Sequence, residues 1–250
     1  MPKRILLQLD TDPQASTFDA VVAVDAGADV LLRHSGVTAT NVVPLVHGAM
    51  FTRGGADLAG TAIFVGGSDV PAAEEVAAAV RKAFFGPVRV SVLLDPSGAN
   101  TTAAAAVVAA GRHLPLSDPH AGIEAVVLGG TGPVGQRVVR LLAGLGASVT
   151  VVSRSRDRAR EVCERVRAKV PLAKLQAIQA DGASAAEPAL AQSLATAALV
   201  VACGPADPDR PIGMIDRAAR RGGQHAGRHG RSGSLRERAG QDQRSGPSLR

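Results

Sequence analysis

The sequence predicts an α/β protein in which an N-terminal domain with a four-stranded, mostly parallel sheet precedes a Rossmann-type domain that is cut short. Three observations lead to this prediction. Short apolar runs of Val, Leu, Ile and Ala, typical of buried strands, alternate with stretches of helical periodicity through residues 4–205. A glycine-rich turn at residues 129–135 lies between an apolar run and an amphipathic stretch. After residue 205 the apolar pattern stops.

The first half of the chain consists of four predicted strand–helix units. None of their turns carries a nucleotide-binding fingerprint, so we expect a separate domain over residues 1–112. A connector rich in Pro and Gly follows over residues 113–122. The expected strands cover residues 4–9, 30–34, 62–65 and 88–94, and the expected helices cover residues 18–26, 41–50, 72–85 and 103–111.

Polar residues follow several of these strands. Asp10 and Asp12 come after the first strand, and Asn100 and Thr101 come after the fourth. Open α/β sheets bind ligands at the carboxyl ends of their strands, which makes such residues candidate ligands. The same residue types also form turns and helix caps, so both interpretations stay open. The turn at residues 66–69 is interpreted as a strand-to-helix turn rather than a phosphate cradle, because it lacks the spaced glycines.

The glycine-rich turn has the G-x-G-x-x-G spacing of dinucleotide-binding proteins. We expect Gly130 to allow a sharp turn, Gly132 to let the backbone approach a pyrophosphate, and Gly135 to let helix and strand pack closely. The diphosphate would lie at the helix N-terminus, where free N–H groups favour an anion. The predicted cofactor-binding residues are Gly130, Thr131, Gly132, Pro133, Val134, Gly135, Ser153, Arg154, Cys203 and Gly204.

The strand after the fingerprint helix indicates which cofactor is bound. In NAD-binding proteins an acidic residue at this strand end holds the ribose 2′-hydroxyl, but here Ser153 and Arg154 occupy the place. An arginine pairs with a 2′-phosphate, so NADP is favoured over NAD. Arg158 and Arg160 are interpreted as the solvated start of a helix. The expected NADP domain spans residues 123–205, with strands over 125–128, 147–152, 175–181 and 198–203 and helices after 133 and over 157–169 and 189–195.

The net charge of +6 comes mainly from the last 45 residues. Residues 206–250 hold ten arginines and five acidic residues, and no sustained apolar period. We therefore predict a basic, low-complexity, disordered tail. Its abrupt onset leads to the hypothesis that it is a frameshift product and that this chain is an inactive version of the protein. Nucleic-acid binding is not favoured, because the tail has no interleaved aromatic residues for base stacking.

The remaining composition indicates a cytoplasmic protein. Cys163 and Cys203 are isolated, which does not indicate a disulfide framework, and Cys203 has no paired histidine that would make it a nucleophile. No metal site is predicted. The apolar start of the chain is too short for a signal peptide, and the longest apolar run, residues 103–110, is too short to span a membrane.

Several stretches carry a family resemblance. They are residues 8–12, 18–22, 25–29, 51–55, 61–67, 84–87, 94–104, 129–135 and the pair Ser153 and Arg154. Together they resemble the NADP-dependent methylenetetrahydromethanopterin dehydrogenases of one-carbon metabolism, over roughly residues 3–205. The resemblance implies a homo-oligomer of two-domain subunits with a pterin substrate in the cleft between domains. The tail does not resemble the later strands, helices and substrate-side lysine of that family.

The resemblance also implies a reaction and its substrate contacts. The reaction is reversible hydride transfer from the methylene bridge to NADP⁺, which needs positioning rather than a catalytic acid or base. Phe18 would pack on the pterin, and the polar contacts would be Asp19, Asn100, Thr101 and Thr102. The alternatives are the same chemistry on methylenetetrahydrofolate, and a non-catalytic NADP-binding protein.

Overall fold

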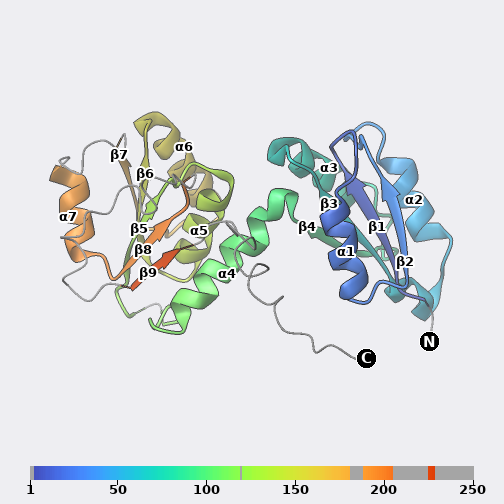
Figure 1. The fold of residues 1–250 in the computed structure, drawn as a ribbon, viewed down its shortest axis with the longest axis horizontal. Helices are drawn as coiled ribbons and strands as arrows, with labels where there is room; N and C mark the ends of the chain where they lie inside the picture. Colours follow the sequence, from blue (N-terminus) through green and yellow to red (C-terminus); the bar gives the residue numbers. More distant parts are fainter. Residues whose placement is uncertain (1–2, 119, 181–187, 205–224, 229–250) are drawn as a thin grey trace, which may run out of the picture. The chain divides into compact units, whose positions relative to one another are not determined.

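The computed structural model describes residues 3–118, 120–180, 188–204 and the backbone of 225–228 (Figure 1). The chain forms two compact units, Met1–Ala105 and Ala106–Arg250. The division falls inside helix α4 (Ala99–Gly111), ahead of the connector predicted at residues 113–122. Helix α4 is continuous through this division.

Unit 1 contains a four-stranded sheet in the order β2-β1-β3-β4, and all its pairs are parallel. The predicted strands and helices are confirmed to within about four residues at each end. The fourth strand starts three residues late because Phe85 and Val88 close a turn, and α4 starts four residues early. The elements are β1 (Ile5–Asp10), α1 (Thr17–Asp25), β2 (Val30–His34), α2 (Val43–Phe51), β3 (Thr61–Gly66), α3 (Val70–Lys82), β4 (Ser91–Leu94) and α4, with 3-10 turns at Gly55–Gly60 and Pro96–Gly98.

The two faces of this sheet are packed differently. Alternate residues of β1 and β3 point into a core that α2 and α3 complete. On the other face lies α1, which has no buried residue of its own. That face therefore remains partly open, and the candidate site lies there. The fully buried members of the core are Leu9, Val42, Val46, Met50, Ile63, Val65, Ala73, Ala77 and Val80.

Unit 2 contains a five-stranded parallel sheet in the order β7-β6-β5-β8-β9. Counted along the unit this is 3-2-1-4-5, the Rossmann strand order, in which the chain reverses direction across the sheet between β5 and β8. The predicted α/β fold class is thus confirmed. The elements are β5 (Glu124–Leu128), α5 (Pro133–Gly144), β6 (Ser148–Ser153), α6 (Arg156–Arg167), β7 (Leu175–Gln179), α7 (Pro188–Thr196), β8 (Leu199–Ala202) and β9 (His225–Arg228).

Helices cover both faces of the sheet in unit 2. Val126 and Leu128 of β5 pack with Leu190 and Leu194 of α7, while buried residues of α5 and α6 lie against the opposite face. Strands buried on both sides read as continuous apolar runs rather than alternating ones. This explains why residues 125–128 are recognisable as a strand from the sequence.

The prediction of a disordered tail is wrong for residues 225–228, which form β9 beside β8. The unpaired edge of β8 offers backbone N–H and C=O groups, and pairing with them does not require apolar side chains. The sequence therefore carries little signal for this strand. Residues 206–224 and 229–250, and with them the frameshift hypothesis, lie outside the described residues.

Within the part of the chain that the structure describes, no helix combines the length and the apolar character needed to cross a membrane.

Candidate functional site

A cavity of about 950 Å³ lies on the open face of the sheet in unit 1. Its volume is in the range of small-molecule sites. Phe64 and Leu93 from β3 and β4 form part of its apolar lining, and Phe18 and Asp19 from α1 line it as well. Polar residues at the carboxyl ends of the strands, among them Asp12, Ser68, Asp95 and Thr101, also belong to the lining, and Arg4, Thr61 and Ser91 line it toward the amino ends.

The loop after β1 is organised by two carboxylates. Asp10 is fully buried and accepts hydrogen bonds from the backbone N–H groups of Asp12 (3.0 Å) and Ser16 (2.9 Å). Asp12 accepts from the backbone N–H of Ser68 at 3.0 Å and from its hydroxyl at 2.8 Å. These two aspartates therefore stabilise turns, which is the role that the sequence left open as the alternative to ligand binding.

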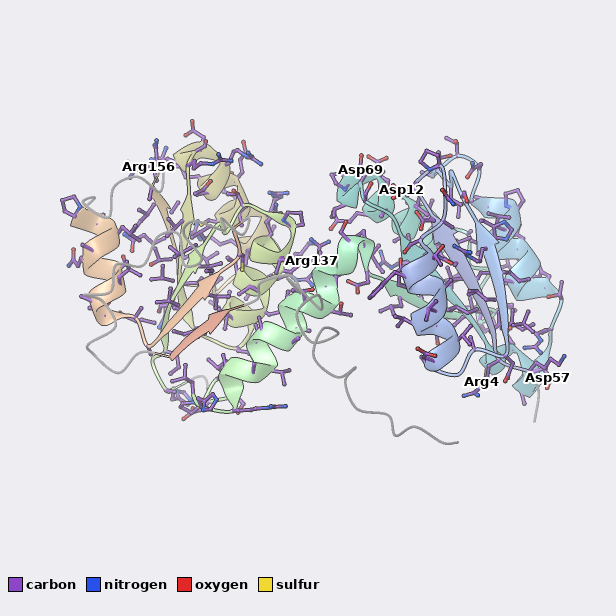
Figure 2. The ribbon with its side chains drawn as sticks, in the orientation of Figure 1. Arg4, Asp12, Asp57, Asp69, Arg137 and Arg156 are labelled. Atoms are coloured by element: carbon purple, nitrogen blue, oxygen red, sulfur yellow. The ribbon has the colours of Figure 1, made fainter. Side chains whose placement is uncertain are left out.

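The hydrogen bond between Asp12 and Ser68 connects the loops that follow β1 and β3. Between these two strands the chain reverses its direction of progress across the sheet of unit 1. Ser68 N–H is occupied by this carboxylate, and Asp69 caps α3 by accepting from Ala72 N–H at 3.0 Å. Residues 66–69 are therefore confirmed as a strand-to-helix turn. Figure 2 shows Asp12 and Asp69 at the same end of unit 1, with Arg4 and Asp57 at the opposite end.

Helix α1 presents both of its predicted substrate residues to the cavity. Ser16 caps the helix through the backbone N–H of Asp19 (3.2 Å), and the Phe18 side chain is 77% exposed. Burial raises the pKa of the Asp19 carboxyl above 3.8, and the charges of Asp10 and Asp95 raise it further, against a hydrogen bond from Ser16 that lowers it. Asp19 thus forms an acidic part of the cavity lining.

The loop after β4 has a structural role that the sequence did not separate from binding. Asp95 accepts from the backbone N–H groups of Asn100 (2.7 Å) and Thr101 (3.1 Å) and from the Thr101 hydroxyl (2.6 Å). This carboxylate therefore holds the first turn of α4. Of the predicted substrate residues here, Thr101 lines the cavity, whereas Asn100 and Thr102 lie outside its lining.

The glycine-rich turn of unit 2 is a sharp strand-to-helix connection. Its left-handed residue is Gly129, with φ of 69°, and not Gly130, which we expected to allow the turn. Gly135 fills its predicted role, because a Cβ there would collide with the carbonyl oxygen of Gly129 and lie 2.8 Å from the Cα of Gly130. Helix α5 then begins at Pro133 with Gly132 as its N-cap, and no side chain caps it. Its first N–H groups suit an anion.

The ends of three neighbouring strands meet at this turn. A Cβ on Gly129 would lie 2.8 Å from the backbone nitrogen of Gly204, just after β8. The hydroxyls of Thr131 and Ser153 are hydrogen-bonded at 3.0 Å, which brings in the end of β6. Arg154 follows Ser153 and is exposed. Tertiary structure thus assembles the predicted cofactor residues at the carboxyl edge of the sheet, with Pro133 and Val134 in the first turn of α5.

Cys203 lies beside this turn, and its backbone N–H donates to the carbonyl of Leu128 at 2.8 Å. Burial raises the pKa of its thiol to about 11. Burial also raises the pKa of the other free cysteine, Cys163 of α6. Both thiols are thus poor nucleophiles near neutral pH, because the thiolate is the reactive form.

We expect Cys203 to react with iodoacetamide at pH 8 about 100-fold more slowly than a thiol of ordinary pKa, because its thiolate is scarcer by that factor. The rate should rise about tenfold per pH unit above pH 8 and level off only above about pH 11. Mass spectrometry of the labelled protein measures the rate, and the urea-unfolded chain serves as the control in which both cysteines react. Labelling of Cys203 at the control rate in the folded chain would contradict the burial of this thiol.

Sequence reasoning missed two residues that organise the site, Gln8 of β1 and Arg33 of β2. Arg33 donates from Nε to Gln8 Oε1 (3.0 Å) and from Nη2 to the carbonyl of Ala15 (2.6 Å), while Gln8 Nε2 donates to the carbonyl of Ser16 (3.0 Å). A polar residue inside the apolar strand of residues 5–9 was the available signal. Its partner lies 25 positions away, so the pair is visible only in the fold.

The strand orders, the cavity and the glycine turn define a two-unit α/β protein whose second unit has the Rossmann dinucleotide-binding fold. Residues 17–97 match the family described as methylene-tetrahydromethanopterin dehydrogenase, N-terminal. This match and the two relatives described next confirm the resemblance inferred from the sequence motifs.

Two curated relatives come from Methylorubrum extorquens. The chain is 42% identical to "Bifunctional protein MdtA" over 191 residues, which are 75% of this chain and 64% of the relative. It is 34% identical to "NAD(P)-dependent methylenetetrahydromethanopterin dehydrogenase" over 154 residues, which are 61% of this chain and 52% of that protein. The chain thus spans less than two thirds of the length of either relative.

Among solved structures, quinate dehydrogenase from Corynebacterium glutamicum in complex with NAD aligns with a TM-score of 0.49 and 15% identity, covering 88% of this chain and 77% of the other. A dipicolinate synthase chain from Bacillus halodurans aligns with a TM-score of 0.35 and 15% identity, covering 82% and 74%. Both scores lie below 0.5, so neither structure bears on the function of this chain.

Proposed function

We propose that this protein is an NADP-dependent methylenetetrahydromethanopterin dehydrogenase in which unit 1 binds the pterin and unit 2 binds the cofactor. One observation carries the proposal. Phe18 and Asp19 line the large cavity of unit 1, and both belong to the stretch that matches the family. The Rossmann turn of unit 2 and the name of the second relative support a nicotinamide cofactor.

In the proposed reaction the C–H bond of the methylene bridge breaks and its electron pair leaves with the hydrogen as hydride. NADP⁺ held at unit 2 supplies the hydride acceptor. The pterin is left as a methenyl cation, so no base has to remove a proton. The work of the protein is then to hold and orient the substrate. Phe18 offers an apolar ring for the pterin, and Asp19 and Thr101 offer polar contacts, with Asn100 and Thr102 as further contacts beyond the cavity lining.

The cofactor site in this proposal is built from backbone as much as from side chains. The uncapped start of α5 receives the diphosphate, and glycines leave the room that it needs. Ser153 and Arg154 receive the 2′-phosphate, which favours NADP. Thr131, Pro133, Val134, Cys203 and Gly204 border the same turn. The site fits a dinucleotide because the first N–H groups of α5 and the positive charge of Arg154 suit an anion.

We further infer a homo-oligomer in a reducing cytoplasm. The free thiols of Cys163 and Cys203 support the reducing compartment. Exposed apolar side chains on α1, among them Val21 and Val24, support association, because such groups gain free energy when covered. Neither tetrahydrofolate activity nor non-catalytic NADP binding has support in the names of the relatives.

The proposal is tested by adding methylenetetrahydromethanopterin and NADP⁺ to the purified full chain and following the absorbance of the reduced nicotinamide. We expect reduction that depends on the pterin, and less with methylenetetrahydrofolate or with NAD⁺. The same assay on a chain whose coding frame is restored after residue 205 tests the frameshift hypothesis, which instead predicts activity in the restored chain alone. Absence of pterin-dependent reduction in both chains would contradict the proposed function.

A further inference from the structure

Helix α1 carries Phe18 and Asp19 but is weakly held by apolar packing. None of its nine residues is buried, and Val21, Val22 and Val24 are each at least half exposed. Apolar burial is the usual force that fixes a helix on a sheet. For α1 that force is small, so another interaction must set where the first turn of this helix lies.

The polar side chains under the loop before α1 supply that interaction. Gln8 is 1% exposed, and its amide lies between Arg33 and the carbonyl of Ser16, each at 3.0 Å. Arg33 also reaches the carbonyl of Ala15, at 2.6 Å. Gln8 and Arg33 are register partners on adjacent parallel strands, so the sheet itself holds them in place.

These bonds act on the residue that starts the helix. Ser16 receives Gln8 at its carbonyl and donates its N–H to the buried carboxylate of Asp10, while its hydroxyl caps α1 at Asp19. Each polar group of Ser16 thus has a partner either in the sheet or in the helix. A displacement of this residue moves the first turn of α1 with it.

We propose that Gln8 and Arg33 form a brace that positions α1, and with it Phe18 and Asp19, at the pterin cavity. The brace rests on the proposed function only for the identity of the ligand. Gln8 and Arg33 do not line the cavity, so they act as positioning residues. A buried amide needs hydrogen bonds that Leu or Met at the same position would not need. Apolar packing alone therefore does not explain a glutamine at this position.

The test uses the full chain and the Gln8→Met variant, which keeps the length of the side chain and removes both of its hydrogen bonds. We expect amide hydrogen exchange between Thr11 and Asp19 to rise about tenfold, while exchange in α3 is unchanged. The dissociation constant of methylenetetrahydromethanopterin should rise about tenfold, and that of NADP should stay within about twofold. Arg33→Met should act in the same way, and Arg33→Lys should restore part of the protection by keeping one donor.

The matched control is Ile63→Val, a fully buried position on β3 that faces the opposite core. It lowers overall stability without touching the loop before α1. If Gln8→Met and Ile63→Val give the same exchange pattern, or if Gln8→Met leaves residues 11–19 protected, the brace is overturned. If the unaltered chain binds no pterin, the proposed function is contradicted, while the exchange pattern still decides whether the brace exists.

Discussion

A Gly135→Ala chain is expected to lose NADP binding and to unfold unit 2 more easily. The added Cβ would collide with the carbonyl oxygen of Gly129 and approach the Cα of Gly130 to 2.8 Å. Both neighbours are backbone atoms of the turn itself, so the strain cannot be relieved by a side-chain rotation. Overpacking of this kind costs about 3 kcal/mol. Urea unfolding measures the loss of stability, and calorimetric titration measures the affinity for NADP.

Gly144→Ala is the matched control for this change because it lies on the same helix, α5. A Cβ there meets no atom within 4 Å, and the position is solvent-exposed. Alanine is the better helix former by about 1 kcal/mol, so this variant should be slightly stabilised and should bind NADP normally. If the two variants have the same stability and the same affinity for NADP, the close backbone approach at Gly135 affects neither property.

An Arg154→Glu chain is expected to bind NADP about 100-fold more weakly, while its affinity for NAD is kept or improved. The change removes a charge-assisted hydrogen bond to the 2′-phosphate and places a carboxylate beside it, and each 1.4 kcal/mol corresponds to about tenfold in affinity. For NAD the same carboxylate can accept from the ribose 2′-hydroxyl. Titration with each cofactor separately measures the ratio of the two dissociation constants.

Arg158→Glu controls for the change in net charge. Arg158 lies in the first turn of α6 and is exposed, and its backbone N–H is already bonded to the Ser155 hydroxyl. A general electrostatic effect is largely screened at ordinary ionic strength, so this variant should alter the affinity for NADP by about twofold at most. An equal loss in both variants would remove Arg154 as the determinant of cofactor choice.

The sequence predicted secondary structure well where the signal is local. Residues 30–34 form a strand with the predicted bounds, and α6 starts one residue from its predicted start. Apolar periodicity and turn residues are properties of neighbouring positions, which explains this accuracy. The strand at residues 225–228 depends on the free edge of β8, a partner more than 20 residues away, and no local pattern reports it.

The candidate sites show the same division. Gly135 and Arg154 are recognisable because their roles depend on spacing within one turn and its following strand. For Asn100 and Thr101, the sequence left ligand and cap as alternatives. The structure shows that Asp95 holds the backbone of both residues, since this is decided by which loop lies against which carboxylate.

By itself, then, the sequence determined the fold class, the Rossmann turn and the family resemblance, all of which rest on short-range patterns. Only the tertiary structure decided that the open face of unit 1 forms a cavity beside Phe18 and Asp19, and that Gln8 meets Arg33 beneath the loop before α1. The physical reason is that both features require strands far apart in sequence to lie side by side. Hydrogen bonds across a parallel sheet are set by the register of β1, β2 and β3, which no single stretch of sequence contains.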